Sequence, residues 1–188
     1  SRLQGHPDMT VTPGIDMSSG SLGLGFAAAL GIALGARADG RDFMTYVMVG
    51  DGECNEGIVW EGAHVAARYG LDNVIAVIDH NKLQQTGWTG DSYEHRISPY
   101  LGDQLADRWR AFDWHVIEVD GHDIPAFLNA VEEAKEVEGK PVAVVAHTIK
   151  GKGVSFMEGD FMWHSKVPND EEFALAMEEL GETDGGAA

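Results

Sequence analysis

Short apolar runs alternate with longer helical patterns along this chain, and this alternation restricts the fold more than any other feature. The apolar runs predict strands at residues 43–49, 74–78, 114–119 and 142–146. The patterns between and after them predict helices at residues 56–69, 125–138 and 171–180. Strands and helices at this spacing form βαβ units. We therefore expect an α/β fold with three layers, α/β/α, around a mostly parallel sheet, and all 188 residues in a single domain.

An unusually apolar segment precedes the first predicted strand. Residues 22–38 contain mainly Ala, Leu, Gly and Phe with almost no polar face, which predicts a helix that is buried on all sides. Gly40 is the expected end of this helix. Residues 1–19 and 79–103 are expected to be loops.

Acidic residues far outnumber basic ones. The chain has 31 Asp and Glu against 13 Lys and Arg, which gives a formal net charge of -18. This balance argues against binding to nucleic acid or to anionic membranes, because both attract basic surfaces. Two explanations of the charge stay open, ordinary solubility and adaptation to a salty cytoplasm.

Cys54 is the only cysteine, so no disulfide can form within the chain. The first residues do not have the pattern of a signal peptide, so we expect none. The longest uncharged apolar stretch, residues 22–36, is too short for a membrane span and is interrupted by glycines. These features predict a soluble protein of the cytoplasm.

A glycine-rich acidic segment directly follows the first predicted strand. Its sequence is Gly50-Asp51-Gly52-Glu53-Cys54-Asn55-Glu56-Gly57, and a predicted helix begins where it ends. Glycine lets the backbone approach a phosphate closely, and the start of a helix offers free N–H groups. The carboxylate of Asp51 would repel a bare phosphate, so it implies a metal ion between the two groups. The alternative is an ordinary strand-to-helix turn, because Asp-Gly is a common turn pair.

A second polar segment, Asp79-His80-Asn81-Lys82-Leu83-Gln84, directly follows the next predicted strand. In a parallel sheet the carboxyl ends of neighbouring strands meet at one edge, where ligands bind. Asp51, the side-chain oxygen of Asn81 and the backbone oxygen of Leu83 would offer three hard oxygen ligands there. Two diphosphate oxygens and a water would complete the octahedron that magnesium prefers.

Together these segments resemble the thiamine-diphosphate fingerprint, a Gly-Asp-Gly after one strand and an Asn after the next. Over nearly its whole length the chain resembles transketolases, and in particular the short, two-subunit transketolases. Further matching motifs are Gln4-Gly5-His6-Pro7, Thr12-Pro13-Gly14, Gly20-Ser21-Leu22-Gly23, Trp60-Glu61, Gly87, Asp120-Gly121-His122, Thr148-Ile149-Lys150-Gly151-Lys152-Gly153 and Trp163-His164.

The resemblance implies a transferase that moves a two-carbon ketol unit from a ketose phosphate to an aldose phosphate, with thiamine diphosphate and magnesium, or calcium, as cofactors. The implied metal ligands are Asp51, Asn81 and Leu83. The implied cofactor contacts are Gly20, Leu22, Gly50, Asp51, Gly52, Glu53, Asn81 and Leu83. The implied catalytic residues are His6 and His164, which would bind the donor sugar, and Glu56, which with Glu61 would lie in a proton network near the subunit interface.

The resemblance also implies parts that this sequence does not contain. In the family, a glutamate on a separate pyrimidine-binding domain activates the cofactor, so the expected partner is a C-terminal pyrimidine-domain subunit in a dimer of heterodimers. Family members carry further substrate histidines before the Gly-His-Pro loop, and this chain would lack that segment. Two rival interpretations stay open: a cofactor-binding subunit without activity of its own, and another thiamine-diphosphate enzyme such as the α-type subunit of a 2-oxoacid dehydrogenase.

Several polar residues of the motifs have structural explanations as well. His164 follows Trp163 and could serve packing instead of chemistry. His122 fits a structural role better, because a Gly-His-Asp turn can fix a loop through its imidazole. Lys150 and Lys152 could meet a sugar phosphate, but a solvated loop is the better explanation of both. Nothing near Cys54 indicates a reactive thiol.

Overall fold

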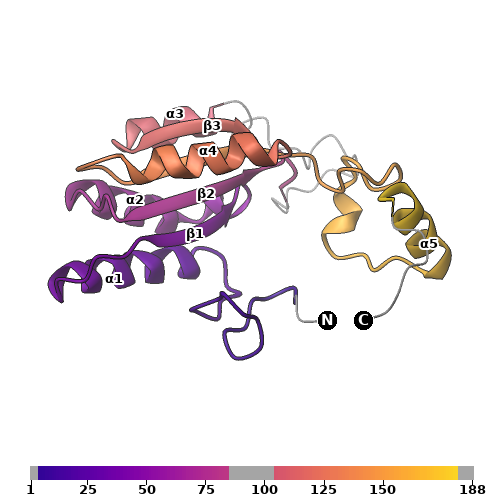
Figure 1. Cartoon of the computed structure of the whole chain (residues 1–188), viewed down its shortest axis with the longest axis horizontal. Coiled ribbons are helices and arrows are strands. Elements are labelled where there is room, and N and C mark those ends of the chain that lie inside the picture. The colour runs from indigo at the N-terminus through magenta and orange to yellow at the C-terminus, as the bar shows by residue number, and fades with distance from the viewer. Residues whose placement is uncertain (1–3, 85–103, 182–188) are drawn as a thin grey trace.

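A parallel sheet forms the centre of the protein in the computed structural model, which describes residues 4–84 and 104–181. Its strands are β1 (Thr45–Gly50), β2 (Val74–His80), β3 (His115–Asp120) and β4 (Val142–His147). Their order in the sheet is β1-β2-β4-β3, and every neighbouring pair is parallel. All the carboxyl ends therefore lie at one edge (Figure 1), and β4 lies directly beside β2 there.

Helices cover both faces of the sheet. One hydrophobic cluster joins one face to α1 (Leu24–Ala38), α2 (Gly57–Arg68) and α3 (Leu105–Ala111). A second cluster joins the opposite face to α4 (Ile124–Lys135). The expected three-layer α/β/α arrangement with a parallel sheet is confirmed, and the predicted strands and helices are all present, with no end shifted by more than three residues.

The expectation of a helix buried on all sides is wrong for α1. Only one stripe of it is buried, centred on Phe26, Leu30 and Ala33, whereas Leu24 is 52% and Ile32 41% exposed. The reason is position, because α1 packs on β1, the edge strand of the sheet, and on α2. The helix also begins at Leu24, so Leu22 lies before it and is exposed.

A short helix that the sequence pattern did not predict is α3. Its segment is rich in charged residues, but Trp109 is completely buried. The ring of Trp109 packs 4.8 Å from Trp114 and 5.8 Å from Phe26 between centroids. Through these aromatic contacts α3 packs into the hydrophobic cluster that α1, α2 and one face of the sheet share. The rest of the expected loop at 79–103, with Gly87, lies outside the described residues beyond Gln84.

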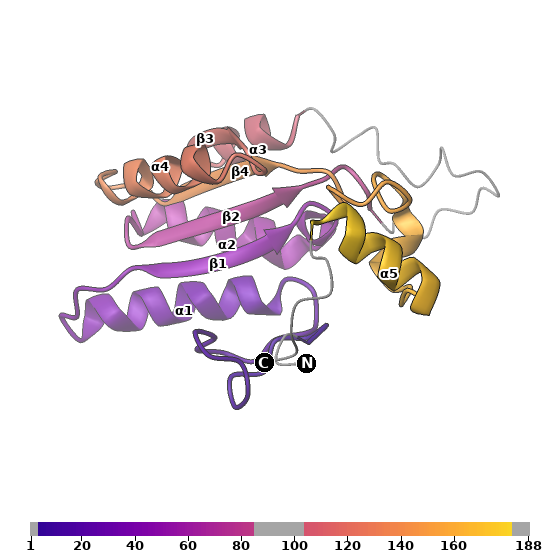
Figure 2. The ribbon, with the colours of Figure 1, turned by 45° about the vertical axis from the view of Figure 1, so that its right-hand side comes forward.

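The last described part of the chain lies beyond the carboxyl ends of the strands. Figures 1 and 2 both place α5 (Asp170–Glu179) past the arrowheads, apart from the helices that cover the sheet. A 3₁₀ turn, η3 (Phe161–His164), precedes it and carries His164. Among the described helices, none is both long and apolar enough to cross a membrane.

Candidate functional site

The loop after β1 buries a carboxylate. Gly50 ends β1, and the 3₁₀ turn η1 (Glu53–Asn55) leads from the loop to the start of α2. Between them, Asp51 is only 2% exposed. Its Oδ2 accepts a hydrogen bond of 2.6 Å from the backbone N–H of Lys82, and its own N–H donates to the carbonyl of Asp79 at 3.1 Å. The loop after β1 is thereby joined to the loop after β2, as the sequence predicted.

Burial raises the pKa of Asp51 to about 6 from its ordinary value of 3.8. The backbone N–H groups of Lys82 and Gly52 lower this pKa, the charge of Asp79 raises it further, and the positive charge of Lys150 lowers it slightly. Asp51 takes part in none of the ion pairs among the described residues. A buried carboxylate without a paired cation is suited to receive a metal ion.

The loop after β2 supplies the other two expected metal ligands. The Oδ1 atom of Asn81 accepts a 2.9 Å hydrogen bond from the N–H of Leu83, and its Nδ2 donates to Asp79 Oδ2 at 3.3 Å. Lys82, which lies between Asn81 and Leu83 in the sequence, has a left-handed backbone with a φ of 64°. The described residues contain no group of three or more His, Cys, Asp or Glu that could hold a metal. One carboxylate, one amide oxygen and one carbonyl oxygen nevertheless fit a hard cation such as Mg²⁺.

Glu53 connects this loop to the start of α1. Its carboxylate accepts hydrogen bonds from the N–H of Gly23 at 2.7 Å and from the N–H of Gly50 at 3.2 Å. Gly23 has a φ of 77°, and a Cβ at this position would come within 2.3 Å of Ile58 Cγ2. Glycine is therefore required where α1, the loop after β1 and α2 meet.

We expect Gly23→Ala to lower the free energy of unfolding by about 2–4 kcal/mol, combining left-handed strain with the clash against Ile58. Gly14→Ala is the matched control, because Gly14 has a φ of 83° but an added Cβ there would meet nothing within 4 Å. Its loss should be limited to the backbone part, about 1–2 kcal/mol. Urea unfolding of both variants measures the difference, and equal losses would show that the contact with Ile58 is easily relieved.

A groove brings together residues from both ends of the chain. It has a volume of about 900 Å³ and lies between the loop before α1, α1 itself and β1. Five of the predicted site residues line it: His6, Gly20, Leu22, Glu53 and His164. The imidazole of His6 lies against Gly20, with its Cγ 3.3 Å from where a Cβ would stand.

The other predicted site residues lie outside the groove lining. Asp51 and Asn81 belong to the hydrogen-bonded loops described above, together with the backbone of Leu83. Glu56 is the exposed residue that precedes α2, and Glu61 is exposed on α2. Both glutamates are therefore accessible on the surface of the described chain, and their expected role at an interface stays a prediction.

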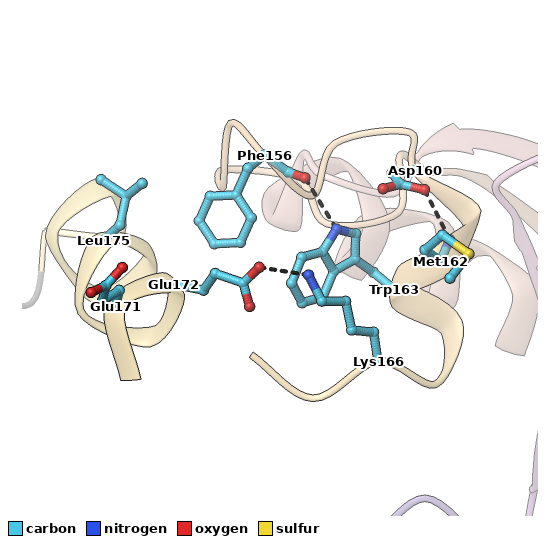
Figure 3. A pocket seen from close by; sticks show the side chains of 8 residues that line it. All are labelled: Phe156, Asp160, Met162, Trp163, Lys166, Glu171, Glu172 and Leu175. Atoms are coloured by element: carbon cyan, nitrogen blue, oxygen red, sulfur yellow. Dashed lines mark hydrogen bonds and ion pairs between the residues drawn. The ribbon is translucent and has the colours of Figure 1, made fainter. Parts of the chain in front are cut away.

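Trp163 anchors the turn that carries His164. Figure 3 shows its indole between Phe156 and Lys166, in a shallow pocket of about 570 Å³ beside α5. Its Nε1 donates to the Phe156 carbonyl at 3.1 Å, and the Lys166 ammonium lies 4.1 Å from its ring centroid. Lys166 also pairs with Glu172 at 2.5 Å. Trp163 therefore packs against its neighbours, whereas His164 is exposed and lines the groove.

Two expectations about other polar residues hold. His122 has a structural contact, because its Nε2 accepts a hydrogen bond of 2.7 Å from the N–H of Ile149. Cys54 is completely buried, and burial raises the pKa of its thiol far above its ordinary value. Its thiol is consequently protonated and unreactive at neutral pH.

The sequence pattern did not predict the contacts that three further residues make beside these loops. Asp79 and Thr148 form a side-chain hydrogen bond from β2 to the end of β4, and Asp79 also binds Asn81. Lys150 lies close enough to Asp51 for its charge to affect the carboxylate. Only the strand order could have indicated these contacts, because it places β4 next to β2.

Comparison with known protein families gives a match over almost the whole chain. The family described as "Transketolase, thiamine diphosphate binding domain" matches residues 1–185. The chain is 44% identical over 178 residues to the 6-deoxy-6-sulfo-D-fructose transketolase subunit SqwG of Clostridium sp. (strain MSTE9), covering 95% of this chain and 62% of that protein. It is 43% identical over 180 residues to a subunit of the apulose-4-phosphate transketolase of Actinobacillus succinogenes, covering 96% of this chain and 62% of that protein.

Solved structures show the same similarity. The transketolase of Campylobacter jejuni superimposes with a TM-score of 0.80 at 30% identity, covering 96% of this chain and 28% of that one. A transketolase from Pichia stipitis in complex with sedoheptulose 7-phosphate superimposes with a TM-score of 0.78, also at 30% identity, covering 96% of this chain and 27% of that one. The chain thus spans about three fifths of the subunit-type relatives and a little over a quarter of these solved chains.

Proposed function

This chain belongs to the transketolase family, as a thiamine diphosphate-binding domain, and from this premise we propose that it is the diphosphate-binding subunit of a two-subunit transketolase. The reaction would move a two-carbon ketol unit from a ketose phosphate to an aldose phosphate. The observation that supports this most directly is the union of the two loops at the carboxyl ends of β1 and β2, where Asp51 binds the backbone of Lys82. The two joined loops carry a carboxylate, an amide oxygen and a backbone carbonyl, which are oxygen ligands of the kind that Mg²⁺ prefers.

Each group of residues has a separate task in this proposal. Asp51, Asn81 and the carbonyl of Leu83 would hold Mg²⁺, and the ion would offset the negative charge of the diphosphate. Gly20, Leu22, Gly50, Gly52 and Glu53 surround the cofactor. Thiamine diphosphate, when bound, supplies a nucleophilic carbon and an electron sink for the transferred unit.

His6 and His164 are the proposed substrate-binding and proton-transferring residues. Both are exposed side chains on the lining of the 900 Å³ groove, and they come from opposite ends of the chain. Each ring can donate a hydrogen bond to a sugar oxygen through one nitrogen and accept one from a sugar hydroxyl through the other. Glu56 would contribute to proton transfer at the edge shared with the partner.

A pyrimidine-domain subunit is the proposed partner, in a dimer of heterodimers. The names of both relatives describe subunits of transketolases. This chain also leaves large apolar side chains uncovered beside the groove, since Tyr46 is 52% and Met48 71% exposed on β1, in addition to Leu24 and Ile32 of α1. An apolar area of this kind is typical of a surface that another chain covers.

Ketol transfer in a reconstituted pair tests the proposal. The chain is co-expressed with a pyrimidine-domain subunit, supplied with thiamine diphosphate and Mg²⁺, and assayed with xylulose 5-phosphate and ribose 5-phosphate. Turnover that disappears with Asp51→Ala is the expected result. A stable complex that binds cofactor without turnover over a panel of ketose phosphates would support a cofactor-binding subunit instead. Failure to bind cofactor would contradict the proposal altogether.

A further inference from the structure

Asp79 touches both loops of the proposed metal site without being one of the expected ligands. Its Oδ2 accepts a 3.3 Å hydrogen bond from Asn81 Nδ2, and its Oδ1 accepts a hydrogen bond from the hydroxyl of Thr148. Its backbone carbonyl accepts from the N–H of Asp51 at 3.1 Å. One residue thus contacts two of the three expected ligands, Asp51 through the backbone and Asn81 through the side chain.

We infer that Asp79, held in place by Thr148, is a positioning residue that sets which end of the Asn81 amide faces the metal. The inference rests on the proposed function, because it concerns the proposed Mg²⁺ site. It predicts that metal affinity depends on two side chains that do not touch the metal.

The hydrogen bonds of Asn81 allow only one orientation of its amide. In the observed orientation, Nδ2 donates to the carboxylate of Asp79 and Oδ1 accepts from the N–H of Leu83 at 2.9 Å. If the amide were turned over, an oxygen would face the carboxylate and an NH₂ group would face an N–H. Both contacts would then be repulsive. The oxygen, which alone can bind a cation, is therefore kept on the side of Leu83, the other expected ligand of this loop.

Thr148 is itself fixed by packing and by the sheet. Its N–H donates to the carbonyl of His80 at 3.2 Å, which continues the pairing of β4 with β2. A Cβ on Gly121 would come within 2.5 Å of Thr148 Cγ2, so the threonine methyl fills the space that the glycine leaves. The methyl and the hydroxyl of Thr148 cannot exchange places without losing both contacts. The hydroxyl is consequently held toward Asp79, and Asp79 toward Asn81.

The experiment measures how much Mg²⁺ is needed for the reconstituted pair to bind thiamine diphosphate, followed by quenching of tryptophan fluorescence. Asp79→Ala is expected to raise the half-saturating Mg²⁺ concentration about 10–100-fold, as is typical when a partner of a metal ligand is removed. Thr148→Val, which keeps the shape of the side chain, is expected to raise it about 3–10-fold. Excess Mg²⁺ should restore cofactor affinity in both variants.

Conservative and control variants separate positioning from a loss of folding. Asp79→Asn keeps an oxygen that can accept from Asn81, and Thr148→Ser keeps the hydroxyl, so both should stay within about threefold of the wild type. Asp120→Asn is the matched control, because Asp120 ends the strand on the other side of β4 and accepts from the N–H of His122 rather than from Asn81. It should leave the Mg²⁺ requirement unchanged.

Three outcomes would overturn the inference. In the first, the wild type binds cofactor with Mg²⁺, and Asp79→Ala and Thr148→Val have the same half-saturating Mg²⁺ concentration as the wild type. Asp79 then does not position a ligand, and the proposed function stands. The same conclusion holds if the two variants bind less cofactor at every Mg²⁺ concentration and melt at a lower temperature without metal. If the wild type itself shows no Mg²⁺-dependent binding, the proposed function fails together with this inference.

Discussion

Asp51→Asn is expected to make the metal-free chain more stable at pH 7 and to abolish its binding of thiamine diphosphate with Mg²⁺. The carboxylate is 2% exposed, and burial raises its pKa from 3.8 to about 6. Folding at neutral pH therefore has to bury a negative charge, which the amide of asparagine avoids. A shift of this size corresponds to about 3 kcal/mol, and we expect a gain of about 1–3 kcal/mol in the free energy of unfolding.

The pH dependence of stability follows from the sign of this shift. The folded-state pKa of Asp51 lies above its unfolded value, so the folded state binds the proton more tightly. Its contribution to stability is fully present below about pH 4 and is lost as the pH rises through about 6. In urea unfolding without metal, the wild type should lose stability over this window relative to Asp51→Asn. Saturating Mg²⁺ and cofactor should reverse the order, because they bind only the folded wild type.

The exposed Asp120 provides the control for this prediction. Asp120→Asn removes a charge at the end of β3, the strand at the opposite edge of the sheet, and the side chain that it changes is exposed. It should change neither the slope of stability between pH 4 and 6 nor the affinity for cofactor. An Asp51→Asn chain that is less stable than the wild type at pH 7 would mean that its hydrogen bond from Lys82 outweighs the cost of burial.

Much of the site could be predicted because parallel strands place their carboxyl ends at one edge. The sequence located Asp51 after one strand and Asn81 after the next, and the register pairs Gly50 with Asp79, so the following residues meet. No knowledge of distant contacts was needed, because β1 and β2 are neighbours both in sequence and in the sheet.

The contacts that could not be predicted depend on the order of the strands in the sheet and on which elements or chains pack against a helix. Thr148 reaches Asp79 across 69 positions of sequence because β4 inserts between β2 and β3. Local patterns do not reveal that order. The exposed stripe of α1 has a similar cause, since Leu24 and Ile32 are as apolar as the buried residues of the same helix. Composition indicates that such a stripe should be covered, but not by which element or chain.

His164→Ala and His6→Ala are each expected to lower kcat/KM for ketol transfer in the reconstituted pair by about 10²–10⁴-fold. Both line the same groove, so a double variant should lose less than the product of the two single losses. Affinity for thiamine diphosphate should change less than turnover, because Asp51 and Asn81, the proposed metal ligands, lie outside the groove lining that the two histidines share. His64→Ala, an exposed histidine on α2 outside the groove lining, is the control and should keep full activity.

The comparison of turnover with cofactor affinity decides what the groove does. If the histidine variants lose turnover and keep cofactor, the groove is the place where the sugar meets the reacting carbon, and His164 acts on substrate although Trp163 beside it serves packing. If the affinity of these variants for thiamine diphosphate falls by the same factor as their turnover, the groove holds the cofactor alone. The residues that bind the sugar must then belong to the partner or to other parts of the protein. Full activity in both variants would remove His6 and His164 from the proposed mechanism.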